Sequence, residues 1–184
     1  MRKLAMGLVV TALLSMGSGC VGRAVSEAMG KVTGAKGITI VIDPVSQRSR
    51  DIALVEYTRF ELGTFTDEFG KTPPALLPLL KDRFERQLAA KKIPNTSGKT
   101  LLIRGKIIHY EDATRAVSQV FGPFEEVVAR VELVDKSSGK VLGVANCIGR
   151  SRETVNQGVE KKADGLAEAI VSWIAAHYPK TEND

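Results

Sequence analysis

The residues best suited to acid–base chemistry lie at positions 109–112, where the chain reads His-Tyr-Glu-Asp. Residues two apart in a strand lie on one face, so His109 and Glu111 would be neighbours. An imidazole beside a carboxylate can support acid–base catalysis or contribute to a metal site. Zinc needs three or four protein ligands, however, and the other histidine, His177, lies far along the chain. We therefore expect a polar strand end, with no catalytic residues and no metal. A small hydrolase or ligand-binding protein using His109 and Glu111 stays the alternative.

A second candidate is the segment Ser97-Gly98-Lys99-Thr100, which matches the end of a phosphate-binding loop. The full motif has a glycine five residues before Gly98, where this chain has Ile93. The motif also needs a following helix whose amides point at the phosphate, whereas the residues from Leu101 onward favour a strand. The segment therefore predicts no nucleotide site, and we expect no cofactor.

Composition limits the remaining functions. With 184 residues, 43% of them hydrophobic, the chain can build one domain around one core. Its net charge of +5 falls to +3 once Arg2 and Lys3 are set aside, and the positive residues are spread along the sequence. Nucleic-acid binding needs a clustered basic stripe with aromatic residues between. The composition therefore argues against a nucleic-acid-binding protein.

The first twenty residues have the pattern of an export signal. Arg2 and Lys3 precede an apolar run over 4–16, which at about 13 residues is shorter than the roughly 20 that a spanning helix needs. The small residues Ser18-Gly19 then lead into Cys20, and this resembles a bacterial lipoprotein box. In that family the cysteine is acylated and becomes the first residue of the mature chain. Cleavage by an ordinary signal peptidase after Gly19 stays the alternative.

A lipidated Cys20 would anchor the protein to a membrane, because two or more acyl chains hold a domain there stably. The next residue is Val21 and not an aspartate. By resemblance to Gram-negative sorting rules, this favours the outer membrane over the inner one, with the domain facing the periplasm. Cys147 would then be a free thiol, and we expect it to be buried and unreactive. Without the lipid, Cys20 and Cys147 could instead form a disulfide.

The mature chain is expected to hold one domain on a tether. The divisions are a signal peptide over 1–19, the lipidated cysteine and a flexible tether over 20–37, an α+β domain over 38–178 and a tail over 179–184. Five strands are expected, over 38–42, 52–60, 100–110, 126–135 and 141–148. The segment 63–72 is predicted to be a loop. The turn at 135–140 predicts a hairpin between the last two strands.

Two helices complete the domain. Pro73-Pro74 opens the first, which ends before Pro94, and the second runs over 157–177. Their apolar stripes are predicted to be Leu77, Leu80, Phe84 and Leu88, and Val159, Ala163, Leu166, Ile170 and Ile174, with Trp173 as a core anchor. The order β-β-α-β-β-β-α predicts a two-layer sandwich, in which both helices cover one face of a largely antiparallel sheet.

The segment 113–124 is long for a connection between two strands and carries apolar side chains. We expect Val117, Val120, Phe121 and Phe124 either to bind a partner protein or to fold back over the open face of the sheet.

The whole pattern resembles a known group of proteins. Phe84-Glu85-Arg86-Gln87-Leu88 closes the first helix, and Val131-Glu132-Leu133-Val134-Asp135 leads through the hairpin into Gly139-Lys140-Val141-Leu142. Over residues 38–178 this resembles small Gram-negative envelope lipoproteins whose domain has no assigned function. It is more distantly similar to curli-secretion lipoproteins and to lipoprotein activators of peptidoglycan synthases.

Those relatives act by binding proteins, so the resemblance implies a non-enzymatic adaptor or assembly factor with an envelope protein as its partner. It carries over no functional residue. The similarity to curli-secretion lipoproteins also implies a further alternative, a homo-oligomer that assembles into a secretion-type ring.

Overall fold

The computed structural model describes residues 35–43, 54–111, 125–151 and 158–178. Part of the predicted organisation lies outside these residues: the signal peptide, Cys20 and the tether up to residue 34, the loop side chains Val117, Val120, Phe121 and Phe124, and the tail over 179–184. Within the described ranges, no helix is both long enough and apolar enough to cross a membrane.

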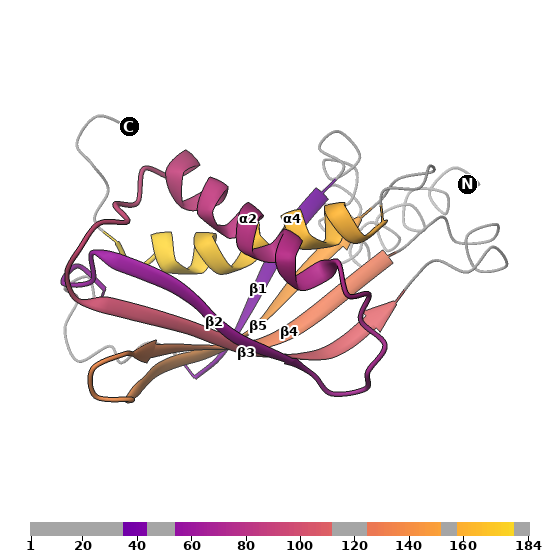
Figure 1. Ribbon diagram of the computed structural model, residues 1–184, viewed down its shortest axis with the longest axis horizontal. Helices are drawn as coiled ribbons and strands as arrows, with labels where there is room; N and C mark the ends of the chain where they lie inside the picture. The colour runs from indigo at the N-terminus through magenta and orange to yellow at the C-terminus, as the bar shows by residue number, and fades with distance from the viewer. Residues whose placement is uncertain (1–34, 44–53, 112–124, 152–157, 179–184) are drawn as a thin grey trace, which may run out of the picture. The chain divides into compact units, whose positions relative to one another are not determined.

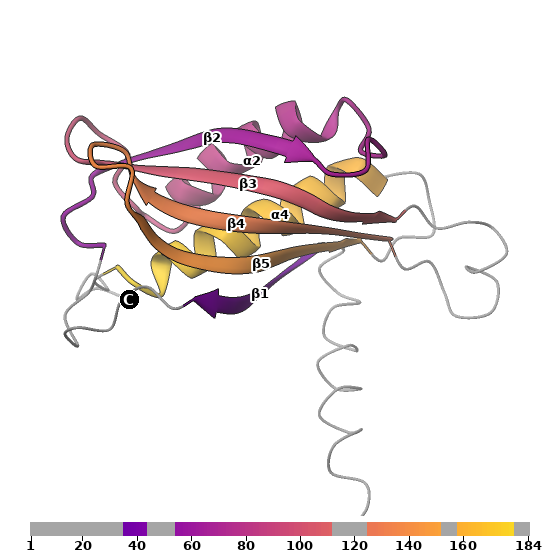
Figure 2. The same ribbon diagram turned by 90° about the horizontal axis from the view of Figure 1, so that it is seen from below.

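The elements follow the predicted order, and the α+β sandwich is confirmed (Figure 1). The strands are β1 (Ala35–Asp43), β2 (Arg59–Asp67), β3 (Thr100–Glu111), β4 (Glu125–Asp135) and β5 (Val141–Ser151). The helices are α2 (Leu76–Ala90) and α4 (Gly158–Ala175). Both helices lie on the same face of the sheet, as Figure 2 shows from the opposite side.

The five strands lie in the order β1-β5-β4-β3-β2, so β1 and β2 form the two edges of the sheet. The pairs β1–β5, β5–β4 and β4–β3 are antiparallel, whereas β2 and β3 are parallel. A parallel pair needs a crossover from the end of one strand to the start of the next, and α2 lies in that connection. Since the direction reverses three times between β1 and β3, the two edge strands run in opposite directions.

The helices bury the expected faces with one change. The buried residues of α2 are Leu76, Leu80, Phe84 and Leu88, whereas Leu77 is 37% exposed. Leu76 lies in the i, i+4 row of Leu80, Phe84 and Leu88, which is the buried face of the helix, whereas Leu77 lies to one side of that row. In α4, Trp173 is buried as predicted.

Close backbone contact holds α4 against β1 and β5. A Cβ atom built on Gly149 would lie 2.3 Å from the carbonyl oxygen of Lys162 and 2.5 Å from the amide nitrogen of Leu166. One built on Gly37 would lie 2.4 Å from the amide nitrogen of Ala169. Only glycine permits such an approach, so these positions set how near the helix lies to the sheet.

The predicted bounds of the second strand were wrong. Residues 54–56 form a turn, which is closed by the amide of Tyr57 donating to the carbonyl of Leu54 at 3.0 Å. The strand itself runs over Arg59–Asp67, through part of the predicted loop. Its pairing with β3 is irregular between Leu62 and Phe65, which removes the alternation by which a strand is identified. At the other edge, β1 begins at Ala35, three residues before the predicted start.

Candidate functional site

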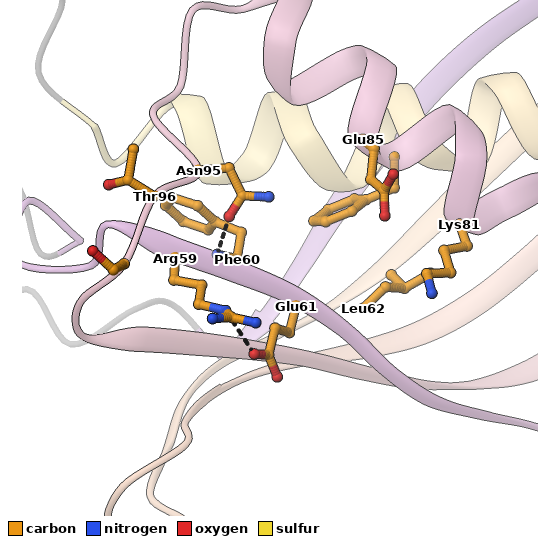
Figure 3. A pocket seen from close by; sticks show the side chains of 10 residues that line it. Arg59, Phe60, Glu61, Leu62, Lys81, Glu85, Asn95 and Thr96 are labelled. Carbon is orange, nitrogen blue, oxygen red and sulfur yellow. Dashed lines mark hydrogen bonds and ion pairs between the residues drawn. The ribbon is translucent and has the colours of Figure 1, made fainter.

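A groove of about 660 Å³ lies along the edge strand β2 (Figure 3). Its walls come from β2, from α2 and from the segment that links α2 to β3, with these lining residues: Arg59, Phe60, Glu61, Leu62, Lys81, Phe84, Glu85, Asn95, Thr96 and Ser97. Phe60 and Phe84 lie at its base but are almost fully buried, so most of the accessible lining is polar. A groove of this kind suits a ligand that is held mainly by hydrogen bonds and charges.

The position of the α2 rim follows from helix geometry. Phe84 is buried against the sheet, and Lys81 and Glu85 lie on the exposed side of the same helix. Because their spacing is i, i+4, they lie one turn apart above the groove, as Figure 3 shows. A cation and an anion are therefore presented side by side on the helix wall.

The segment after α2 forms the second wall. Lys92 adopts a left-handed conformation (φ 54°), and Ile93 donates its backbone N–H to the carbonyl of Leu88 at 3.0 Å, which ends the helix. The buried side chain of Ile93 anchors the segment to the core. The following residues, Asn95 and Thr96, are thereby held beside the start of β2.

Asn95 and Thr96 occupy the place of a neighbouring strand. The backbone N–H of Phe60 donates to Oδ1 of Asn95 at 2.9 Å, and the N–H of Thr96 donates to the carbonyl of Thr58 at 2.8 Å. The N–H of Phe60 thus points away from β3. Since backbone groups alternate in direction along a strand, those of Leu62 face outward as well. In the described part of the chain no strand pairs with this side of β2, so the edge is open beyond Phe60.

Gly98 fixes the path of this segment. Its φ is +141°, and a Cβ atom there would lie 2.1 Å from Oγ1 of Thr58. That hydroxyl donates to the carbonyl of Ser97 at 3.1 Å. The residues after Gly98 form strand β3, as the sequence predicted. Gly98 therefore lets the groove wall pass close to Thr58.

A buried acidic group lies where the hairpin meets β2. Oδ2 of Asp135 accepts a hydrogen bond from the Tyr57 hydroxyl at 2.8 Å and lies 3.1 Å from Nζ of Lys99. The Ser137 hydroxyl, the Ser138 amide and the Tyr57 hydroxyl hold the pKa of Asp135 well below its usual range. We name Tyr57, Lys99, Asp135 and Ser137 the Asp135 cluster.

The Asp135 cluster joins the 54–57 turn, the start of β3 and the hairpin. Burial, helped by the hydrogen bond to Asp135, raises the pKa of Tyr57 to about 12. The hydrogen bond to Glu56 and the contact with Asp135 raise the pKa of Lys99, although burial opposes the shift. All of these interactions are internal to the protein, so the cluster stabilises the strand ends that carry the groove.

The charges at the foot of the groove are also paired. Nε of Arg59 lies 2.8 Å from Oε1 of Glu61, and Nζ of Lys136 binds the other oxygen of the same carboxylate. The hydrogen bond from Lys136 holds the pKa of Glu61 below its usual value. Glu61 is therefore ionised at neutral pH, and the rim carries both signs of charge.

The structure brings His109 and Glu111 together but not into the groove. Nε2 of His109 lies 3.6 Å from Oε2 of Glu111, and the two side chains are about half exposed. The pairing of β3 with β4 is irregular between Ile107 and His109. For this reason Tyr110 packs partly against the core, beneath the Nζ atom of Lys162 at 4.0 Å. Among the described residues, no group of three or more His, Cys, Asp or Glu could hold a metal.

Cys147 is free and fully buried, as expected. Burial raises the pKa of its thiol to about 12.

The sequence analysis did not find the groove, because the residues that line it come from three separate segments of the chain. The one available signal was the polar run Asn95-Thr96-Ser97-Gly98 between a helix and a strand.

No family model matches the sequence, and no curated protein matches it either. Among solved structures, the chain is similar to the PelC dodecamer from Paraburkholderia phytofirmans, with a TM-score of 0.51 and 12% identity over 77% of this chain and 97% of that one. A point variant of that PelC dodecamer gives a TM-score of 0.50 at 15% identity with the same coverage. A minor lipoprotein from Acinetobacter baumannii gives 0.42 at 16% identity over 65% of this chain and 94% of that one. At such identities the PelC structures show a shared fold alone.

Proposed function

We propose that the protein is a non-enzymatic lipoprotein of the bacterial envelope, a protein-binding adaptor or assembly factor that uses the β2 groove. The observation that carries this proposal is the open edge of β2 beside a groove whose accessible lining is mostly polar. An extended segment that joins a sheet edge gains main-chain hydrogen bonds, while its alternate side chains enter the neighbouring groove. The partner is therefore a protein that offers an extended segment.

The proposed location rests on the sequence. The export signal and the lipobox support an anchor at Cys20, and Val21 supports the outer membrane with the domain facing the periplasm. The shared fold with PelC, which forms a dodecamer, supports self-association as one way in which the protein acts.

The test begins with cross-linking in intact cells, followed by purification from solubilised membranes and mass spectrometry. We expect a lipid-modified Cys20 at the mature N-terminus and recovery of an envelope protein, another copy of the chain, or both. Lys81→Glu, which reverses a charge on the groove rim, should reduce this recovery.

Arg86→Glu is the matched control, because Arg86 lies on the same helix, is exposed and does not line the groove. Equal recovery with both variants would contradict the groove. An unmodified Cys20 would contradict the anchor.

Two other proposals are separable by the same capture. A hydrolase or ligand-binding protein would use His109 and Glu111, whose contact supports it. His109→Ala should leave capture of the partner unchanged. A loss of capture in that variant would favour the alternative that uses His109 and Glu111. Partner binding by the loop 113–124 predicts that Phe121→Ser abolishes capture without unfolding the domain.

A further inference from the structure

The second edge of the sheet, β1, is also exposed. Ile40, Val41 and Ile42 are three consecutive β-branched residues, with exposed fractions of 52%, 47% and 49%. Proteins usually protect an edge strand with charges, prolines or a covering segment, because an open apolar edge pairs with other chains. This run has no such charge or proline within it, so it is suited to pair with another strand.

Hydrogen bonding shows which backbone groups of β1 face outward. The N–H of Gly37 donates to Oε2 of Glu168 in α4 at 2.9 Å, so it is not bonded to β5. In an antiparallel pair such outward residues alternate with inward ones. The outward groups along β1 are therefore those of Gly37, Thr39 and Val41.

The two edges are alike in this respect. Glu168 accepts from Gly37 at one edge, as Asn95 accepts from Phe60 at the other. Each side chain occupies one outward N–H, and among the described residues no strand pairs with the next groups of either edge.

The side chain of Val41 lies on the same face of the sheet as the groove. Val41 is paired with Ala145, a core residue, and its side chain is therefore on the helix side of the sheet. Leu62 packs partly against the core on that side as well. In an antiparallel pair, residues directly opposite each other share a face, so Val41 opposite Leu62 would place the valine over the groove floor.

The charges at the ends of the two edge strands are also complementary. β1 and β2 run in opposite directions, so the end of β1 and the start of β2 lie at the same end of the sheet (Figure 2). Asp43 ends β1, and Arg59, about half exposed, begins β2. With Val41 opposite Leu62, Asp43 comes near Phe60, whose outward N–H is already bonded to Asn95, so the strand pairing ends there and only the side chains of Asp43 and Arg59 meet across the contact.

We propose that β1 of a second copy pairs antiparallel with the open edge of β2, with Val41 opposite Leu62 and Asp43 beside Arg59. This inference rests on the proposed function and names the occupant of the groove as the chain itself. The contact is head-to-tail, joining two different edges, so repetition of it gives a ring where the rotation closes. Pairing of two β1 edges would give a dimer instead and leave the groove empty.

The first test measures the mass of the full chain in detergent by size-exclusion chromatography with light scattering. The wild type should form a discrete oligomer. Val41→Lys should weaken its association by about tenfold or more, because a charged side chain would replace the apolar contact between Val41 and Leu62. Val141→Lys, at an exposed valine of an interior strand, is the matched control and should keep the wild-type mass.

Charge reversal tests the register. Asp43→Arg and Arg59→Asp should each weaken association, and the chain carrying both changes should recover it. Circular dichroism should show the same folded spectrum for each variant, which separates loss of association from unfolding.

A cross-link tests the pairing itself. Chains carrying Val41→Cys and chains carrying Leu62→Cys are mixed and treated with a short bismaleimide, which should link one kind to the other. Pairs linked between two Val41→Cys chains would show the β1–β1 dimer and overturn the proposal.

The outcomes separate this inference from the function on which it rests. An oligomer that persists in Val41→Lys without the mixed cross-link refutes the β1–β2 contact and leaves self-association standing. A wild-type monomer at all concentrations refutes the inference, and capture of another envelope protein would then carry the adaptor function alone.

Discussion

Replacement of Gly149 by alanine should destabilise the domain more than a single added methyl group suggests. The new Cβ atom would lie 2.3 Å from the Lys162 carbonyl oxygen and 2.5 Å from the Leu166 amide nitrogen. Both atoms belong to the backbone of α4, so no side-chain rotation can make room. The helix itself has to move.

The size of the loss in stability follows from how far α4 must move. Ordinary contact begins at 3.4 Å, so α4 has to retreat by about 1 Å near Leu166. A gap of that size removes about a quarter to a half of the dispersion energy of each contact it opens. The fully buried side chains of Ala163, Leu166 and Ile170 lie on this helix. We therefore expect the upper end of the usual overpacking cost, about 3 kcal/mol.

Thermal unfolding followed by circular dichroism measures this cost, which corresponds to a fall in Tm of roughly 6 to 12 °C. Gly70→Ala is the control, because a Cβ atom there meets nothing within 4 Å. Its left-handed φ of +63° should cost only about 1 kcal/mol. Hydrogen exchange should also show faster opening of α4 in Gly149→Ala and not in the control. Equal costs for the two variants, with unchanged exchange in α4, would refute the close-contact account.

Three further results are expected. Asp135→Asn should flatten the acid dependence of stability measured by urea unfolding. The native pKa of Asp135 lies below its unfolded value near 3.8, so its contribution is present above that pH and lost as pH falls; an unchanged slope would contradict this. Gly98→Ala should cost about 1 to 3 kcal/mol and weaken capture at the groove, since its Cβ atom would meet Thr58, whereas Gly139→Ala should leave capture intact. Cys147 should react with a thiol reagent only at the rate of unfolding, and rapid labelling of the native protein would show that its burial is incomplete.

The fold could be predicted where one physical pattern dominated. In β4, Val127, Ala129, Val131 and Leu133 alternate and are all buried, and the adjacent turn fixed the hairpin. In α4 the apolar spacing is regular. In β2 the irregular pairing after Leu62 broke the alternation, while Leu54 and Tyr57 are buried from a turn and therefore resembled strand residues.

The groove could not be predicted from local patterns. Its rim residues Lys81 and Glu85 look like the solvent-exposed side of any helix. The decisive contact, the side chain of Asn95 accepting from Phe60, joins segments 35 positions apart and depends on the crossover through α2. The pair His109 and Glu111, by contrast, was found because strand spacing alone brings those side chains together.

The place of β1 in the sheet has a consequence for the order in which the chain can fold. Gly37 near the start of the domain is bonded to Glu168 near its end, 131 positions later. Closing so long a segment is slow, and contacts of this kind form after the local ones. The hairpin of β4 and β5 can form from its own residues, but β1 has no partner until β5 and α4 have been synthesised. Among the described strands, the one that is synthesised first therefore waits longest for its partner, and its apolar residues stay unpaired until most of the chain has been made.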